Sequence, residues 1–241
     1  MKKVLTLCVA SAMAAACSGT PPVERAPGET FYETKNLPIE AAEAVAVRGP
    51  FKVTVFGTAD APEVTLMGPP EMIADTLVEV QESTVSIRFV EGAEWSWNTG
   101  AGMHALVNLP SLNSVALQGS GSIKVYGAKA ASFEAGTGGS GSITITGLEA
   151  DNVELGVGGS GSVSAQGTAT NASYGVGGSG IVDAKRLRVA TAQIGIGGSG
   201  SIYADVSESA EIGVGGAGKV EVVGGAECTF EQPQAGQIEC R

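Results

Sequence analysis

The chain has 241 residues, of which 43% are apolar and 16% are charged, and its net charge is −11 at pH 7. This apolar fraction is typical of a folded protein and excludes a disordered chain. The acidic balance repels phosphate groups, so it excludes nucleic acid as a partner and makes an anchor necessary for any membrane contact.

Residues 1–16 predict a bacterial lipoprotein signal peptide. Two lysines form a positive start, and the uncharged apolar run that follows is too short to span a bilayer but fits a signal-peptide core. The run ends in Ala-Ala-Ala before Cys17, which resembles the bacterial lipobox, although Ala14 stands where leucine is usual. The resemblance implies that Cys17 carries lipid. The alternative is ordinary cleavage after an Ala-x-Ala sequence.

Residues 17–29 predict a tether between this anchor and the folded part. They are rich in serine, proline and glycine and have no apolar period. Two or more acyl chains hold a protein stably on a membrane, so lipid on Cys17 is the expected membrane contact. Ser18 stands where aspartate is the familiar inner-membrane retention signal. By that resemblance, we expect an outer-membrane lipoprotein that faces the periplasm or the cell surface.

Residues 30–118 predict the beginning of the folded domain, with a degraded form of the repeat that follows. Several short alternating apolar runs read as strands. Residues 69–75, which open with two prolines, predict one short helix with a prolyl start. We therefore predict one continuous domain over residues 30–241.

Glycine-rich blocks recur through residues 119–225 at intervals of 20, 20, 19, 20 and 18 residues. Each block is followed by an alternating apolar run, which is typical of a strand with one buried face. The blocks begin at Gly119, Gly139, Gly159, Gly178, Gly198 and Gly216.

The runs align into columns of like residues, which predict how the units stack. A unit of about twenty residues cannot bury its apolar side chains alone, whereas parallel stacking at about 4.8 Å buries them all. The glycines are expected at sharp corners where φ is positive. The apolar columns are Ile123, Ile143, Val163, Val182, Ile202, Val220; Val125, Ile145, Ala165, Ala184, Ala204, Val222; Ala135, Leu155, Tyr174, Ile194, Ile212; and Phe133, Val153, Ala172, Ala192, Ala210, Phe230.

The predicted fold is therefore all-β: a single-stranded, right-handed parallel β-helix, or solenoid, with rungs of about twenty residues. The right hand follows from the crossover rule for parallel strands. Two polar columns are expected to face outward. They are Glu134, Glu154, Ser173, Gln193, Glu211, Glu231 and, beside them, Ser132, Asn152, Asn171, Thr191.

The C-terminal residues 226–241 predict a cap that holds Cys228 and Cys240. Export implies an oxidising compartment, so these two cysteines are expected to form a disulfide. The loop that it closes is worth roughly 3 kcal/mol on the chain-entropy estimate.

A family resemblance follows from these motifs. Leu109-Pro110 and Leu112 lead into Val115-Ala-Leu-Gln-Gly-Ser-Gly-Ser-Ile123, and Gly-Ser-Gly rungs follow. This pattern resembles the head GIN-domain family of auto-transporter adhesins over most of residues 40–225. The resemblance implies the fold and an adhesin-like role, and it carries over no functional residues.

The sequence predicts no catalytic residue, cofactor or metal site. A serine–histidine–aspartate relay would have to use His104, the one histidine, but there is no nucleophile-elbow pattern. The glycine-rich stretches do not open a helix, as a phosphate site requires. CxxC spacing and a histidine-rich tract, which favour zinc, are both missing.

Two residue pairs are candidates for ligand binding. Glu134 and Glu154 are predicted to stand about 5 Å apart on adjacent rungs, where they could bind a cation or act as acid and base. The alternative is a solvated polar face. Trp95 and Trp97 share one face if extended and could bind a sugar, a peptide or a partner protein. The alternative is that they pack as a cap over the coil.

These observations predict a non-enzymatic cell-envelope lipoprotein that acts as an adhesin-like, scaffold or binding module. Its expected partners are the membrane, through Cys17, and an envelope protein or a glycan. One alternative is a polysaccharide-active β-helix enzyme that uses outward carboxylates. A third hypothesis is a calcium-stabilised module.

Overall fold

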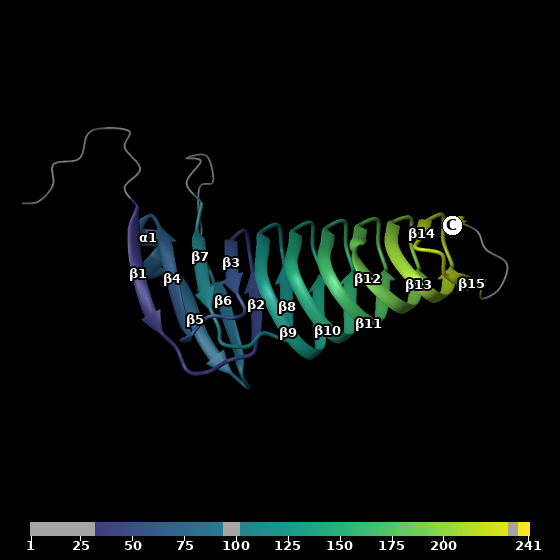
Figure 1. Ribbon diagram of the computed structural model, residues 1–241. Coiled ribbons are helices and arrows are strands. Elements are labelled where there is room, and N and C mark those ends of the chain that lie inside the picture. Colours follow the sequence, from purple (N-terminus) through teal and green to yellow (C-terminus); the bar gives the residue numbers. More distant parts are fainter. Residues whose placement is uncertain (1–31, 94–101, 231–235) are drawn as a thin grey trace, which may run out of the picture.

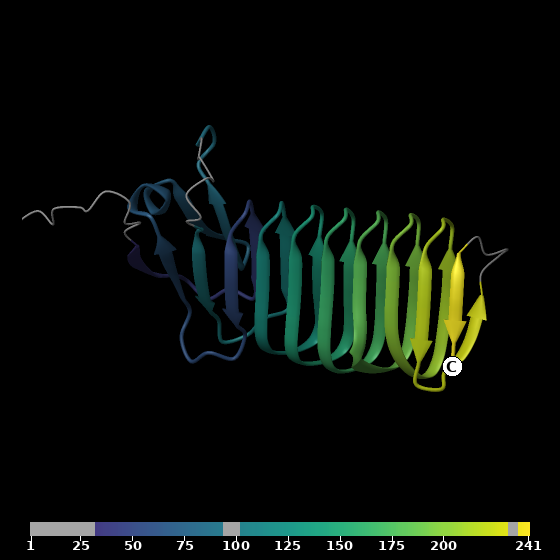
Figure 2. The ribbon, with the colours of Figure 1, turned by 90° about the horizontal axis from the view of Figure 1, so that it is seen from above.

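The structure is a computed structural model that describes residues 32–93, 102–230 and 236–241. Its strands form one 16-stranded sheet that coils into a β-solenoid (Figures 1 and 2). The predicted all-β solenoid with rungs of about twenty residues is confirmed. The regular rungs are β9 (Ser122–Thr137), β10 (Ser142–Val157), β11 (Ser162–Val176), β12 (Ile181–Ile196) and β13 (Ser201–Val214).

Each rung consists of one long strand, which has two arms and a bend between them, and of a corner that follows the strand, as β10 illustrates. Residues 142–146 form a first arm, residues 147–151 a bend, residues 152–157 a second arm, and residues 158–161 a corner that leads to the next rung. Alternate side chains point inward, which follows from the two-residue period of a strand. The inward side chains of β10 are Ile143, Ile145, Leu148, Val153, Leu155 and Val157, all at most 3% exposed.

Successive rungs pair in parallel, and their register confirms the predicted columns. Ile143 pairs with both Ile123 and Val163, and the same column continues through Val182, Ile202 and Val220. Hydrogen bonds also join the corners, because the N–H groups of Ser140 and Gly141 donate to the carbonyl oxygen of Gly119 at 3.1 and 3.0 Å.

Two predicted column members are wrong at the C-terminal end. Thr229 pairs with Glu211 and so takes the place that was predicted for Glu231, which lies outside the described residues, and Phe230 pairs with Ile212 and does not continue its predicted column. The physical reason is the last interval: it has 18 residues, and the cap keeps this shorter spacing, whereas the prediction continued with twenty. Phe230 is consequently 53% exposed and does not extend the buried stack.

Glycines meet two different requirements. At the bends, Gly127 and Gly147 have φ of 70° and 75°, a conformation that side chains rarely adopt. At the corners, a Cβ on Gly159 or Gly178 would overlap the carbonyl oxygen of the equivalent glycine one rung earlier. The expectation of positive φ at the block glycines is confirmed at Gly119, where φ is 120°, and is wrong at Gly159 and Gly178, where the close approach of the backbones is what requires glycine.

The N-terminal strands follow the coil only in part. The axial order on one side is β1-β4-β7-β3-β9, and on the other β5-β6-β2-β8-β9, so β2 and β3 sit between strands that come later in the chain. The β1–β4, β4–β7 and β5–β6 pairs are antiparallel. These strands are β1 (Glu33–Pro38), β2 (Ala44–Arg48), β3 (Lys52–Phe56), β4 (Glu63–Gly68), β5 (Thr76–Gln81), β6 (Thr84–Phe89), β7 (His104–Asn108) and β8 (Ser114–Gln118).

The predicted short helix is confirmed as α1 (Pro70–Ala74), with proline at its start. It buries Met72 and Ile73 against the open end of the coil, and the Thr76 hydroxyl donates a hydrogen bond to the Met72 carbonyl at 2.7 Å. The expectation that residues 30–118 begin the coil with a degraded repeat is wrong for the antiparallel strands β1, β4 and β5 and for the order of the strands, whereas β2, β3 and β8 do pair in parallel along the coil.

The far end of the coil is closed by β14 (Lys219–Val223), β15 (Glu227–Phe230) and β16 (Gln237–Cys240). β16 continues the first-arm side and β15 the second-arm side. The predicted Cys228–Cys240 disulfide is present and joins β15 to β16, with a Cα–Cα distance of 6.6 Å. It therefore ties the two arms together at the last rung.

The corner packing generates a test with a matched pair of glycines. Gly178→Ala should lower the free energy of unfolding by about 1–3 kcal/mol, because its Cβ has no room against the preceding rung. Gly177→Ala should be neutral or slightly stabilising, since a Cβ there meets nothing within 4 Å. Denaturant unfolding of the full chain measures both. Equal losses for the two variants would contradict this account of the corners.

Candidate functional site

A groove of 1030 Å³ runs along the outside of the second arms, which we call the second-arm groove. It is lined from β8 at one end to β15 at the other, so it follows the coil axis across the regular rungs. Its lining residues are Asn113, Ser114, Ser132, Phe133, Glu134, Asn152, Val153, Glu154, Asn171, Ala172, Ser173, Thr191, Ala192, Gln193, Ser209, Ala210, Glu211 and Thr229.

The strand period explains the two rows of polar side chains along the groove. On β10, Asn152 and Glu154 point outward, whereas Val153 between them points into the core. Register repeats this pattern on every rung, so each second arm contributes two outward side chains to the groove. Ala172, Ala192 and Ala210 occupy the intervening inward positions on the later rungs.

Hydrogen bonds order one of these rows into a ladder. The Asn171 amide donates to Oδ1 of Asn152 at 3.0 Å, and the Thr191 hydroxyl donates to Oδ1 of Asn171 at 2.9 Å. These three side chains come from β10, β11 and β12, so the ladder spans three rungs. The predicted outward column of Asn152, Asn171 and Thr191 is therefore present, and its members hold one another in place.

The other row contains three carboxylates among uncharged polar side chains. Glu154 pairs in register with Glu134, so the structure brings together the two carboxylates that the sequence singled out, on adjacent rungs. Both side chains are exposed. Glu211 adds a third carboxylate, and the described lining contains no lysine or arginine. The groove therefore presents negative charge together with amides and hydroxyls.

The structure brings none of the other predicted site residues that it describes into this groove. Trp95 and Trp97 lie outside the described residues, as does Cys17. His104 lies on β7, in register with Lys52 on one side and Met67 on the other. Partial burial and the nearby charge of Lys52 lower the pKa of its imidazole. The environment of His104 on the sheet therefore favours its neutral form.

Within residues 32–93, 102–230 and 236–241, no three histidine, cysteine or acidic side chains gather closely enough to hold a metal ion. In that part of the chain, no helix has the length and apolar character to cross a membrane.

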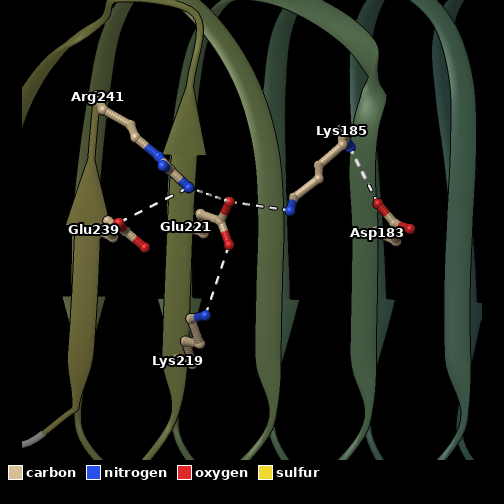
Figure 3. A network of polar contacts seen from close by, with 6 residues as sticks. All are labelled: Asp183, Lys185, Lys219, Glu221, Glu239 and Arg241. Atoms are coloured by element: carbon tan, nitrogen blue, oxygen red, sulfur yellow. Dashed lines mark hydrogen bonds and ion pairs between the residues drawn. The ribbon is translucent and has the colours of Figure 1, made fainter.

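A second polar cluster lies on the first arms near the C-terminal end, and Figure 3 shows it around Glu221. Glu221 Oε1 accepts from Lys185 Nζ at 3.1 Å and from Arg241 at 3.0 Å, and Lys219 Nζ lies 3.7 Å from Oε2. The Glu221 side chain is only 11% exposed. Hydrogen bonds from Lys185 and Arg241 lower the pKa of this carboxyl.

Register also explains this second cluster, which the sequence analysis missed. Asp183, Tyr203, Glu221 and Glu239 form one outward column, and Lys185 Nζ lies 4.6 Å from the centre of the Tyr203 ring. The signal was available in the sequence, because these residues follow the intervals that align the apolar columns beside them. The ion pairs of this cluster connect the last rungs, and its residues do not line the second-arm groove.

Comparison with known proteins identifies relatives of the whole fold. The profile of the family described as "Putative auto-transporter adhesin, head GIN domain" matches residues 43–226. No curated protein matches the chain.

Three solved structures illustrate the likeness of the fold. A "putative adhesin" from Bacteroides fragilis has a TM-score of 0.79 at 19% identity, over 89% of this chain and 99% of that one. A "putative lipid binding protein" from Parabacteroides distasonis has a TM-score of 0.69 at 19% identity, over 87% and 96%. A "putative adhesin" from Parabacteroides merdae has a TM-score of 0.67 at 16% identity, over 86% and 95%. At these identities the likeness shows the fold.

The Glu221 cluster generates a pH-dependent prediction. Glu221→Gln should lower the melting temperature at pH 7, because it removes a carboxylate held by three cations. The folded-state pKa is depressed, so the stabilisation is complete above the ordinary pKa of 4.5 and disappears as the pH falls through the lower folded value. The melting curves of variant and wild type should therefore converge in acid.

Glu239→Gln is the matched control for this measurement, since Glu239 is 51% exposed and lies 3.8 Å from Arg241. It should change the melting temperature little at any pH. A Glu221→Gln deficit that persists unchanged in acid would show that packing, and not charge, explains the effect.

Proposed function

Because the chain belongs to the family described as "Putative auto-transporter adhesin, head GIN domain", we propose that it is a non-enzymatic, adhesin-like binding module of the cell envelope whose ligand lies in the second-arm groove. One observation carries this proposal: in-register stacking presents two outward polar side chains at equivalent positions on rung after rung. A long, rigid, repetitive surface suits recognition of an extended partner.

The arrangement of the carboxylates favours binding over catalysis. Glycoside hydrolysis needs one carboxyl that its surroundings keep protonated while the other is ionised. Glu134 and Glu154 stand in equivalent, exposed positions on adjacent rungs, so nothing distinguishes their roles. The described lining also lacks the basic groups that would orient a substrate for turnover.

The anchor forms the second part of the proposal. Lipid on Cys17 would hold the protein at the outer membrane, with residues 18–29 as the tether. The described chain starts at β1 and ends at β16, which lie at opposite ends of the strand order (Figure 1). If the anchor precedes β1, the end of the coil that the disulfide closes lies at the opposite end of the strand order from the membrane attachment.

Blocking the groove tests the site of binding. Ser173→Trp places a large side chain in the middle of the groove and should reduce binding of the full-length protein to isolated envelopes of its own bacterium at least several-fold. Thr144→Trp is the matched control, because Thr144 is an exposed outward residue on the first arm of β10. Any contribution from lipid insertion is the same in both variants. Equal binding by the two would place the ligand elsewhere.

Replacing Cys17 tests the anchor. In the producing bacterium, Cys17→Ser should abolish lipid attachment, so the protein should lose the added acyl mass and should no longer partition into the detergent phase. Mass spectrometry and phase separation measure these two effects. If the unaltered protein already has an unmodified N-terminus after an Ala-x-Ala cleavage, the anchor proposal is wrong.

A further inference from the structure

The repeat distance of the second-arm groove restricts the kind of ligand that fits it. The outward column on one wall has seven members, Ser114, Glu134, Glu154, Ser173, Gln193, Glu211 and Thr229, each paired with the next. Paired strands lie about 4.8 Å apart, so equivalent polar groups recur at that distance along the axis. A linear polymer with the same repeat could make one set of contacts on every rung.

An extended peptide does not have this repeat. It advances about 3.3 Å per residue, and side chains on one face recur about every 6.6 Å, so neither distance matches a rung. A peptide would also find few free backbone groups, since the second arms of β10, β11 and β12 have ladder partners on both sides. By contrast, one pyranose unit of an extended β-linked glycan is about as long as a rung is high. Successive units of a β-1,4-linked chain present opposite faces, so the same face recurs at every second rung and the glycan stays in step with the coil.

The two walls offer complementary hydrogen-bonding groups. One wall carries amides and hydroxyls, as in Asn152 and Thr191, and the other carries carboxylates, as in Glu134 and Glu154. A sugar hydroxyl both donates and accepts, so it can donate to a carboxylate and accept from an amide N–H. The ladder through Asn171 already fixes its side chains, which reduces the rotamer entropy lost on binding.

The volume and the negative charge of the groove restrict the class of ligand further. A volume of 1030 Å³ lies at the upper end of the range of about 300–1,000 Å³ for small-ligand pockets, so an oligomer fits better than a single sugar. Glu134, Glu154 and Glu211 repel uronic-acid or phosphorylated chains and attract amino sugars.

We infer that the second-arm groove binds a linear, β-linked glycan that is neutral or carries amino groups; this inference rests on the proposed function. The glycan lies along the coil axis with one sugar residue per rung. The juxtaposition that supports this inference is the hydrogen-bonded amide–hydroxyl row beside the carboxylate row, both repeating at the rung spacing.

Oligosaccharides of graded length test the inference directly. The full-length protein in detergent is titrated by calorimetry with β-1,4-linked glucosamine, β-1,4-linked N-acetylglucosamine and galacturonate oligomers, from dimers to octamers. Affinity should rise with each added residue and level off near the heptamer, because the carboxylate-bearing wall has seven members. Glucosamine oligomers should bind most tightly and galacturonate oligomers least, and added salt should reduce that difference.

Two variants connect this length dependence to the groove. Ser173→Trp should remove the gain beyond trimers, because it divides the groove near its middle, whereas Thr144→Trp should leave the series unchanged. Asn171→Ala breaks both ladder hydrogen bonds and should weaken hexamer binding roughly 3- to 10-fold, as expected for the loss of one or two hydrogen bonds. Melting temperatures confirm that each variant is folded.

The outcomes separate this inference from the proposed function. If no oligomer binds, or if affinity is independent of length, the glycan inference is overturned. Should Ser173→Trp still reduce envelope binding in that case, the groove remains the binding site for another class of ligand. If Ser173→Trp changes neither measurement, both the inference and the proposed site are wrong.

Discussion

Parallel pairing of equivalent residues on successive rungs is the constraint on which the rest of the structure depends. Backbone hydrogen bonds join the arms and the corners, and they place Ile123, Ile143 and Val163 directly over one another in the core. Corner glycines allow this spacing because a Cβ would collide with the rung below. The same registration acts on the outside, where it converts isolated polar residues into the two rows of the second-arm groove. The same repeat therefore forms the core with its inward side chains and the candidate site with its outward side chains.

The regular half of the fold could be predicted from the sequence because its apolar residues recur at nearly constant intervals. The N-terminal half could not, since alternating runs predict strands without saying which of them pair. Nothing in residues 44–56 shows that β2 and β3 lie between strands that come later in the chain. Phe230 was misplaced because a rung two residues shorter shifts every position after it. Periodicity thus gives register only while the period is constant.

The candidate site was predictable in its residue types but not in its shape. The columns that contain Glu134, Glu154, Asn152 and Asn171 follow from counting, and the structure brings them to one surface. The concave form of that surface and the Asn152–Asn171–Thr191 ladder depend on how the arms curve and which rotamers meet. The Glu221 cluster was overlooked for a different reason: its charged residues lie far apart in the sequence, and the prediction did not extend the repeat intervals to this outward column.

The near-identity of the rungs has a consequence for how such a protein can change over evolution. Residues 142–161 and 162–180 are interchangeable in outline, so unequal recombination between their coding segments can add or delete a whole turn without disturbing the caps. Each event would alter the length of the second-arm groove by about 4.8 Å and leave its cross-section unchanged. Under the proposed function, the number of repeats would then set the length of the ligand that the groove accommodates.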